Sequence, residues 1–490
     1  MSAPSRRASV ASAVLVAAWA AVAAALCAGS LGWPLIHDAP IMHYIAWRIA
    51  EGAVPYRDLF DMNFPGTYLV HLAALRAVGT SDAGWRVFDL AWLAATALAL
   101  GAFARPWGGF AAAGSALFFA VYHLSGGAWL AGQRDFFLVI FLVLGALGVA
   151  RWASDGRRAS LAWGGFLLGA AATIKPHAVL LAGALAAVVL VVGVRAGSAV
   201  ASPLAVFLGS LLVMPAAVTA WIAAAGGLPA WREIVLHYLV PYYAGLGRPR
   251  SWAFYRWRLW IPIAAAVVFS LAHAWRARRF TVRHAIATLG IAYGLVHHFG
   301  QGKGWEYHLY PLAAFAALVA FAELGPALVQ RRLLGVALAA SLTVALIALA
   351  QRGVEAANAG WIRDKGDLVR EVRRDLAPVG PGETVQVFDT SEGGVHALLS
   401  LGILQPTRFL YDFHFFHDEA APEIQALRAE LMRDLAARPP RFIVVFDRGW
   451  PAGGPERLAR FSELAQWLAE HYRPGPIRPG YTVYEKRRDP

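Results

Sequence analysis

The chain has little of what redox, metal or nucleotide chemistry requires. Its 490 residues include a single cysteine, Cys27, so it forms no internal disulfide and no zinc–thiolate site. Charged residues account for only 15% of the sequence. The sequence has no glycine-rich phosphate loop, so nucleotide binding is not supported. Internal repeats and low-complexity tracts are also absent.

Apolar residues dominate what is present. Hydrophobic residues make up 58% of the sequence, and the mean hydropathy is +0.50, far above the range of soluble proteins. Stretches of about 20 apolar residues recur over the first 350 positions, and each is long enough to cross roughly 30 Å of hydrocarbon. We therefore expect a polytopic α-helical membrane protein.

The expected spans follow the apolar stretches. They cover residues 10–31, 85–104, 107–124, 135–152, 160–174, 177–194, 203–225, 259–275, 284–299, 308–326 and 332–350. Segment 64–79 is short and carries His71 and Arg76, so we expect it to lie in the membrane interface and not to cross. This assignment predicts eleven spans.

The arginines predict the orientation. With eleven spans, one side of the membrane receives Arg6, Arg7, Arg105, Arg151, Arg157, Arg158, Arg195, Arg276, Arg278, Arg279, Arg283, Arg331 and Arg332. This asymmetry satisfies the positive-inside rule. We expect a protein of the bacterial inner membrane with a cytoplasmic N-terminus. The formal charge of +13 then reflects mostly these loops, and nucleic acid is not an expected partner.

The composition divides the chain into two parts. Residues 1–350 form the expected membrane domain, whose first outer loop, 32–84, is long. Residues 351–490 have the composition of a soluble domain, expected on the outer face. There, strand-like runs at 384–388, 407–411, 441–446 and 481–484 alternate with helical patterns near 393–402, 421–437 and 455–470. This alternation predicts a small α/β domain.

Polar and aromatic residues gather in the outer loops. They are Asp38, Asp58, Asp61, Arg134, Asp135, Lys175, Arg256, Arg258, Lys303, Trp305, Tyr307 and His308. A carboxylate can serve as general base, cations can stabilise a leaving phosphate, and aromatic rings can stack on sugars. Together these groups suit a reaction between a lipid-borne phosphate and a hydroxyl.

Each of these residues also has a structural explanation. Asp38 precedes Ala39-Pro40 and is a suitable N-cap for a helix over 39–51. Arg134 and Asp135 are compatible with a local ion pair, and Lys175 with a snorkelling lysine. The tryptophans and tyrosines of 231–260 are typical of an interfacial belt. The concentration of all of them on one face is what favours a functional site.

No metal site is expected. His297 and His298 are adjacent but have no clear third ligand, and the pair His414 and His417 is equally weak. A divalent-metal requirement stays open, because no set of ligands has convincing spacing.

The order of these motifs resembles the polyprenyl-phosphate-dependent glycosyltransferases of the GT-C superfamily. The similarity is to the branch that contains bacterial protein O-mannosyltransferase relatives and the lipid A aminoarabinose transferase. The matching elements are Asp38 to Gly52, Tyr56 with Asp58 and Phe64-Pro65, Asp135 at the start of a span, Thr173 to Pro176, and Lys303 to Pro311. The resemblance covers essentially the whole chain.

The resemblance implies transfer of a hexosyl or pentosyl group from a polyprenyl-phosphate sugar with inversion. It assigns Asp38 as catalytic base and brings Asp135 into the catalytic site. In the aminoarabinose branch a Glu-Lys pair precedes the first-loop proline, whereas this chain has Asn63-Phe64. The lysine of that pair contacts the donor phosphate in the family. In this chain its place would be taken by Lys175, Lys303 or Arg134.

Two other functions are compatible with the residues. A transporter or flippase of a lipid-linked or anionic substrate would use the outer cations as a vestibule, although inverted repeats and mid-span charges are missing. The second alternative function is that of a ligase or polymerase that acts on a diphosphate-linked glycan. The sequence leaves open whether the acceptor is a glycan, a lipid or a protein.

Overall fold

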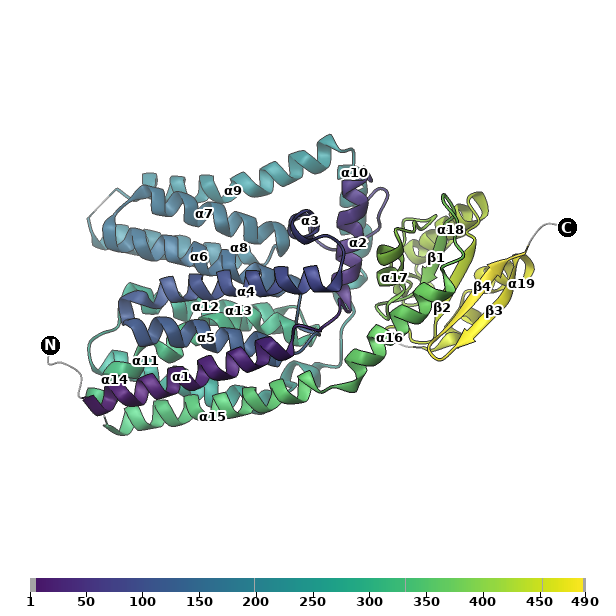
Figure 1. Cartoon of the computed structure of the whole chain (residues 1–490). Coiled ribbons are helices and arrows are strands. Elements are labelled where there is room, and N and C mark those ends of the chain that lie inside the picture. Colours follow the sequence, from purple (N-terminus) through teal and green to yellow (C-terminus); the bar gives the residue numbers. More distant parts are fainter. Residues whose placement is uncertain (1–5, 198, 331, 452, 488–490) are drawn as a thin grey trace.

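The computed structural model describes residues 6–487 except 198, 331 and 452. Long helices form a bundle, and a C-terminal domain projects from one of its ends, opposite the end at which the chain begins (Figure 1). Of the arginines used to predict orientation, Arg331 and the side chains of Arg6, Arg7 and Arg332 lie outside the described residues. Which end of the bundle is cytoplasmic stays a prediction.

The bundle consists of helices whose backbone polar groups are paired within each helix, as a bilayer requires. They are α1 (Arg6–Gly29), α4 (Asp82–Ala104), α5 (Gly109–Ser125), α6 (Arg134–Asp155), α7 (Arg158–Ile174), α8 (Ala178–Arg195), α9 (Ala201–Ala224), α11 (Trp257–Arg276), α12 (Val282–Gly300), α13 (Tyr310–Ala322), α14 (Leu324–Gln330) and α15 (Arg332–Ala357).

Among the described residues, eight helices are long and apolar enough to cross a membrane, and α5 is a shorter apolar helix. The expected class, a multi-pass α-helical membrane protein, is confirmed. The expected count of eleven is larger, because it also includes α5, α7 and α12. For these three helices, crossing stays a prediction.

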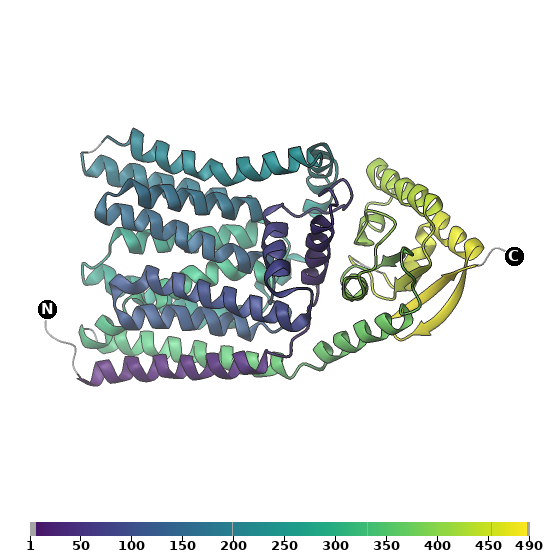
Figure 2. The same ribbon diagram turned by 45° about the horizontal axis from the view of Figure 1, so that its top comes forward.

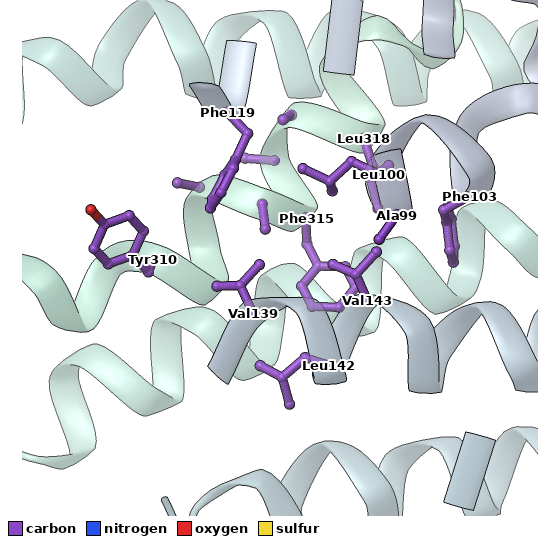
Figure 3. Packing of buried hydrophobic residues seen from close by; sticks show 14 of the residues in the cluster. Ala99, Leu100, Phe103, Phe119, Val139, Leu142, Val143, Tyr310, Phe315 and Leu318 are labelled. Carbon is purple, nitrogen blue, oxygen red and sulfur yellow. The ribbon is translucent and has the colours of Figure 1, made fainter. Parts of the chain in front are cut away.

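Helix α13 forms the centre of the bundle. All of its residues are buried. Its Phe315 and Leu318 pack among side chains of α4, α5 and α6, including Leu100, Phe119 and Val139 (Figure 3). Since Tyr310 lies at the start of this helix, the core fixes the position of the segment that immediately precedes it, 303–309.

Two short helices from the first loop lie across the end of the bundle that faces the C-terminal domain (Figures 1 and 2). They are α2 (Asp38–Ala50) and α3 (Gly66–Val78). Helix α3 is about 20 Å long at 1.5 Å per residue, which is less than the hydrocarbon thickness. This agrees with the expectation that segment 64–79 does not cross.

The C-terminal domain contains a four-stranded sheet in the order β1-β2-β4-β3. Strand β1 (Val385–Phe388) is parallel to β2 (Phe442–Phe446), whereas β2 and β4 (Tyr481–Lys486), and β4 and β3 (Tyr472–Arg478), are antiparallel. Its helices are α16 (Gly360–Asp375), α17 (Gly394–Leu401), α18 (Pro422–Ala437) and α19 (Ser462–His471). The small α/β domain is therefore confirmed, while its boundary at residue 350 stays a prediction.

One strand assignment was wrong, and one strand was missed. Segment 407–411 does not join the sheet; instead, Phe409 forms an isolated bridge with Phe60 of the first loop. Strand β3 was not expected, because Pro474 and Pro476 interrupt it. Prolines are tolerated there because β3 is an edge strand.

The first loop holds the domain against the bundle. The Tyr44 hydroxyl donates to the Ile403 carbonyl at 3.1 Å and accepts from the Gln405 amide at 3.2 Å. The amide of Phe60 donates to the Arg408 carbonyl at 2.8 Å. Phe60 itself is buried, with its ring 5.4 Å from that of Phe409. The first loop, the end of α9 and the domain therefore share one hydrophobic core.

Replacing Phe60 by alanine tests this docking. Truncating a buried phenylalanine costs about 3–5 kcal/mol, so Phe60→Ala is expected to lower the melting temperature and to speed proteolysis between α15 and α16. The matched control is Phe254→Ala, because the Phe254 side chain is 61% exposed. Equal proteolysis rates for the two variants would contradict the docking role of Phe60.

Candidate active site

Asp38 is the first residue of α2 and faces Arg134. The N-cap of α2 is His37, whose φ of 56° is rare for a residue other than glycine, and no side chain caps the helix. The His37 ring packs 3.6 Å from that of Trp129. The Oδ2 atom of Asp38 lies 3.4 Å from Nη2 of Arg134, and its side chain is 28% exposed. The helix-cap explanation for Asp38 is therefore wrong.

Asp38 and Arg134 line a cavity of about 230 Å³ between the bundle and the C-terminal domain, here called the Asp38 cavity. The bundle contributes aromatic and polar groups, and the domain closes the opposite side. The lining residues are His37, Asp38, Met62, Asn63, Trp129, Gln133, Arg134, Tyr243, Arg248, Trp305, Tyr307, Thr390, Ser391, Glu392, Tyr411, Phe413, Arg448, Gly449 and Trp450.

A second cavity, of about 350 Å³, adjoins the first and is here called the lysine cavity. Its polar lining includes Arg134, Lys175, His177, Lys303 and His308. Among the residues that the structure describes, no carboxylate and no residue of the C-terminal domain lines it. A cavity with several cations and no acid favours an anionic ligand such as a phosphate.

The two cavities share one wall. The residues that line both cavities are Met62, Asn63, Arg134, Tyr243, Trp305 and Tyr307. Asp38 lines only the first cavity, whereas Lys175 and Lys303 line only the second. Arg134 is thus the cation common to both sides, and the carboxylate and the lysines lie on opposite sides of it.

Asp135 is brought to the site but does not line either cavity. Its side chain is fully buried, with Oδ2 at 3.2 Å from Nζ of Lys175 and Oδ1 at 2.6 Å from Nε2 of His297. Lys175 also donates to Oε1 of Gln301 at 3.0 Å. Burial lowers the pKa of Lys175, and the neighbouring Asp135 opposes this effect. Asp135 therefore supports Lys175 and is itself screened from a ligand.

Lys303 approaches the lysine cavity from the opposite side. Its ammonium donates to the carbonyls of Tyr243 and Leu246, which leaves one of its three N–H donors for a ligand. Burial, together with the cations Lys175 and Arg134, lowers the pKa of Lys303 to about 8. Burial also lowers the pKa of His177 to about 4, so this imidazole is neutral near pH 7.

Asp58 and Asp61, which the sequence suggested as ligands, are not brought to either cavity. Asp58 pairs with the exposed Arg57 at 2.8 Å and accepts from the Val54 amide, so it stabilises a surface turn. Asp61 is fully buried and accepts from Asn63 at 2.9 Å and from the Tyr68 hydroxyl at 2.7 Å. Its burial raises its pKa. Asp61 acts indirectly, because it fixes Asn63 in the shared wall.

The other predicted residues divide into two groups. Trp305 and Tyr307 line both cavities, and His308 lines the lysine cavity. Arg256 and Arg258 line neither, and both are exposed. Arg256 directly precedes α11, and Arg258 is the second residue of that helix.

The start of helix α3 packs directly on the turn Thr173–Pro176, which contains Lys175. Gly66, at its start, packs so closely on Thr173 that a Cβ there would meet Oγ1 of that residue at 2.3 Å. The first-loop proline and the Thr173–Pro176 turn are thus parts of one contact. The contact brings the first-loop element Phe64-Pro65 and the element Thr173 to Pro176 together in space.

Sequence reasoning missed the part of the Asp38 cavity that the C-terminal domain contributes. Tyr411, Arg448 and Trp450 carry no motif, and nothing in their local pattern marks them as site residues. Tyr243 and Arg248 belong to the loop whose aromatic residues were noted, but the loop alone does not indicate which of them face inward.

A buried polar network holds the loop that precedes Arg134. Asp89 pairs with Arg86, accepts from the Gly132 amide at 3.0 Å and lies 3.1 Å from Nε2 of His123. The Nδ1 atom of His123 is 2.6 Å from the hydroxyl of Tyr310. Groups from α4, α5 and the loop before α6 therefore contact one carboxylate, and Tyr310 of α13 joins the network through His123. The network fixes the start of α6.

The histidine pairs do not form metal sites. The Nε2 atom of His298 bonds to the Ala253 carbonyl at 2.9 Å, while His414 and His417 both bond to the Tyr238 hydroxyl. Within the described part of the chain, no group of three His, Cys, Asp or Glu side chains is arranged to hold a metal ion. The expectation of no metal site stays a prediction, and a divalent-metal requirement stays open.

Comparison with known proteins supports the fold. No family model matches the chain, and no curated protein sequence matches it. The structure is similar to crystal structures of ArnT from Cupriavidus metallidurans. For the structure bound to undecaprenyl phosphate, the TM-score is 0.62 at 12% identity, covering 95% of this chain and 97% of that one. For the apo state, the TM-score is 0.59 at 13% identity, with 95% and 96% covered.

The resemblance to the GT-C aminoarabinose transferase branch, inferred from sequence motifs, is therefore confirmed at the level of the fold. The similarity extends over both the helical bundle and the C-terminal domain, since nearly all of each chain is covered.

The network around Asp89 is testable by a single substitution. Asp89→Asn leaves Arg86 buried without its counter-charge, a change that costs about 3–5 kcal/mol in buried pairs. A large fall in melting temperature of the purified protein is expected. Asp58→Asn, in the exposed Arg57–Asp58 pair, is the control and is expected to leave it unchanged. Equal melting temperatures for the two variants would contradict the network's role.

Proposed function

We propose that this protein, which has the fold of the ArnT structures, is a membrane glycosyltransferase. It moves a sugar from a polyprenyl-phosphate donor to an acceptor hydroxyl with inversion at the anomeric carbon. The ArnT structure bound to undecaprenyl phosphate supports a polyprenyl phosphate as the lipid ligand. The reaction takes place at the end of the bundle that faces the C-terminal domain, which we assign to the extracytoplasmic side.

One observation carries the proposal. Asp38 and the lysines line separate cavities, and Arg134 lies in the wall between them. An inverting displacement needs its base and its leaving group on opposite faces of the reacting carbon. The shared wall at Asn63 and Arg134 provides a position for that carbon between the two.

The donor phosphate occupies the lysine cavity. Lys175, Lys303 and Arg134 supply positive charge there and replace the lysine that the first-loop motif lacks. Their charge stabilises the phosphate as it departs, because cations fixed in a partly buried site act on the charge that develops. Trp305 lies in the wall that the donor sugar would contact.

Asp38 serves as the general base. Its carboxylate takes the proton of the acceptor hydroxyl, whose oxygen bonds to the anomeric carbon. The bond from that carbon to the phosphate oxygen breaks, and the electron pair leaves on the phosphate. Asp38 suits this role because it is partly exposed to the cavity and Arg134 orients its carboxylate.

Asp135 acts as a positioning residue. It is fully buried, and its contact with Lys175 holds that ammonium toward the lysine cavity. Its effect on transfer is therefore exerted through Lys175, and it does not touch the substrate.

A transporter or flippase is not favoured. Transporters bind their substrate near the membrane midplane, at broken helices. Here Asp38, Arg134 and Lys175 lie at helix termini, in cavities that the first loop helps to line. The C-terminal domain lines the Asp38 cavity.

The proposal predicts loss of transfer in Asp38→Asn. Removing a general base lowers turnover by about 100- to 10,000-fold. The measurement is release of free polyprenyl phosphate by the purified protein, reconstituted in vesicles with polyprenyl-phosphate sugars. Asp58→Asn, outside both cavities, is expected to retain activity. Turnover of Asp38→Asn within a few fold of the wild type would exclude Asp38 as the base.

The pKa of Lys303 predicts a pH dependence of donor binding. Below about pH 8 the ammonium is charged and binds the phosphate, whereas above this pH it loses its proton. The donor KM should therefore rise by up to about tenfold per pH unit above pH 8. Lys303→Arg, which stays charged, should keep the KM flat. A rise of the same size in the arginine variant would contradict this assignment.

A further inference from the structure

A third cavity opens beside the Asp38 cavity and has no role in the proposed chemistry. It measures about 330 Å³, and its walls come from the loop before α11, the segment before α13, the end of α15 and the start of α16. Trp129, Arg248 and Trp305 line both this cavity and the Asp38 cavity. We call it the tryptophan cavity.

Aromatic side chains form much of its lining. Besides Trp129 and Trp305 these are Trp252, Tyr255 and Trp361. The last three are 37%, 41% and 39% exposed, respectively. Large aromatic rings grouped around an open cavity are unusual on a protein surface unless a ligand covers them.

Polar groups are interleaved with these rings. The guanidinium carbon of Arg248 lies 4.2 Å from the centre of the Trp252 ring and 4.5 Å from that of Trp305. Arg352 pairs with Glu306 at 2.5 Å, and Arg256 and Glu355 complete the polar lining. Rings are thus placed next to planar groups that donate and accept hydrogen bonds.

This pairing fits the chemistry of a saccharide. The C–H face of a pyranose ring packs on an aromatic ring, while the hydroxyls at its edge bond to guanidinium and carboxylate groups. A fatty acyl chain would cover these charged groups without offering them hydrogen bonds in place of water, which is costly. The mixed lining therefore favours sugar over lipid.

We propose that the tryptophan cavity binds a saccharide portion of the acceptor, so that the acceptor is a glycan whose reacting hydroxyl enters the Asp38 cavity past Trp129 and Trp305. This rests on the proposed function and narrows the acceptor class. It also gives the exposed aromatics of this loop a role other than that of an interfacial belt.

The first test separates acceptor binding from donor binding. Trp252→Ala is expected to raise the KM for the acceptor about tenfold, the equivalent of one lost stacking contact, with kcat changed far less. Trp252→Phe keeps an aromatic face and should restore most of the loss. Trp361→Ala, on a different helix, should act like Trp252→Ala, which guards against a local folding defect in one variant.

The matched control is Trp275→Ala. Trp275 is also an exposed tryptophan, at 73%, but it lies at the other end of α11 and does not line the cavity. It should behave as the wild type. If all three tryptophan variants raise the acceptor KM equally, or if Trp252→Ala and Trp361→Ala both leave it unchanged, the aromatics form only an interfacial belt and the proposal fails.

The second test identifies the acceptor class. The reconstituted protein is given a radiolabelled polyprenyl-phosphate sugar with one of three acceptor pools from the cells that make it: saccharides released from membranes by mild acid, glycan-free lipids, and peptides of exported proteins. Label is expected in the saccharide pool alone. Intact glycolipids and intact glycoproteins are then tested separately as acceptors, and label in one of them shows which class of molecule carries the saccharide. Label in glycan-free lipid or in bare peptide would overturn the proposal.

Failure of this inference is distinguishable from failure of the proposed function. If no arm releases free polyprenyl phosphate, the glycosyltransferase assignment itself fails. If polyprenyl phosphate is released but the saccharide pool is not labelled, only the acceptor class is wrong.

Discussion

The contact between Asp38 and Arg134 joins two parts of the chain that are almost a hundred residues apart. Their charged atoms lie 3.4 Å from each other, at the point where the Asp38 cavity and the lysine cavity share a wall. The pair fixes the Asp38 carboxylate in the Asp38 cavity, while the Arg134 guanidinium lines both cavities. Under the proposed function, the base and the site of the departing phosphate would thus lie close together without neutralising each other, because Lys175 and Lys303 line only the lysine cavity.

Buried carboxylates hold this arrangement in place. Asp61 fixes Asn63 in the shared wall, Asp89 fixes the loop before Arg134, and Asp135 fixes Lys175. Each is 0% exposed and paired, as the cost of burying a charge requires. None of these three lines a cavity, so their contribution is to geometry and not to contact with a ligand. In the sequence, Asp61 lies in the first loop, Asp89 within an expected span and Asp135 at the start of another, and no local pattern indicates these supporting contacts.

The sequence was sufficient for the membrane class, for 64–79 as a segment too short to cross, and for the gathering of Asp38, Arg134, Lys175 and Lys303, since apolar length and the order of motifs are local properties. It could not separate Asp38 from Asp58, because both are acids in one loop and only the fold decides which faces a cavity. It also missed strand β3 and the domain residues Tyr411 and Trp450. Strand β3 pairs with the adjacent β4 but is interrupted by Pro474 and Pro476. The roles of Tyr411 and Trp450 arise from contacts between segments hundreds of residues apart, which no local periodicity reports.

The C-terminal domain lines only one of the two main cavities. The lysine cavity is built from the bundle alone, whereas the Asp38 cavity is completed by the loops around Thr390, Tyr411 and Arg448. Under the proposed function, the groups that hold the lipid phosphate and the surface that meets the second substrate are therefore separable in the chain. Substitutions in the domain loops would then change which molecule is modified while the lipid-phosphate cavity stays constant. Such a division would let one membrane scaffold take on new acceptors through changes in its C-terminal domain alone.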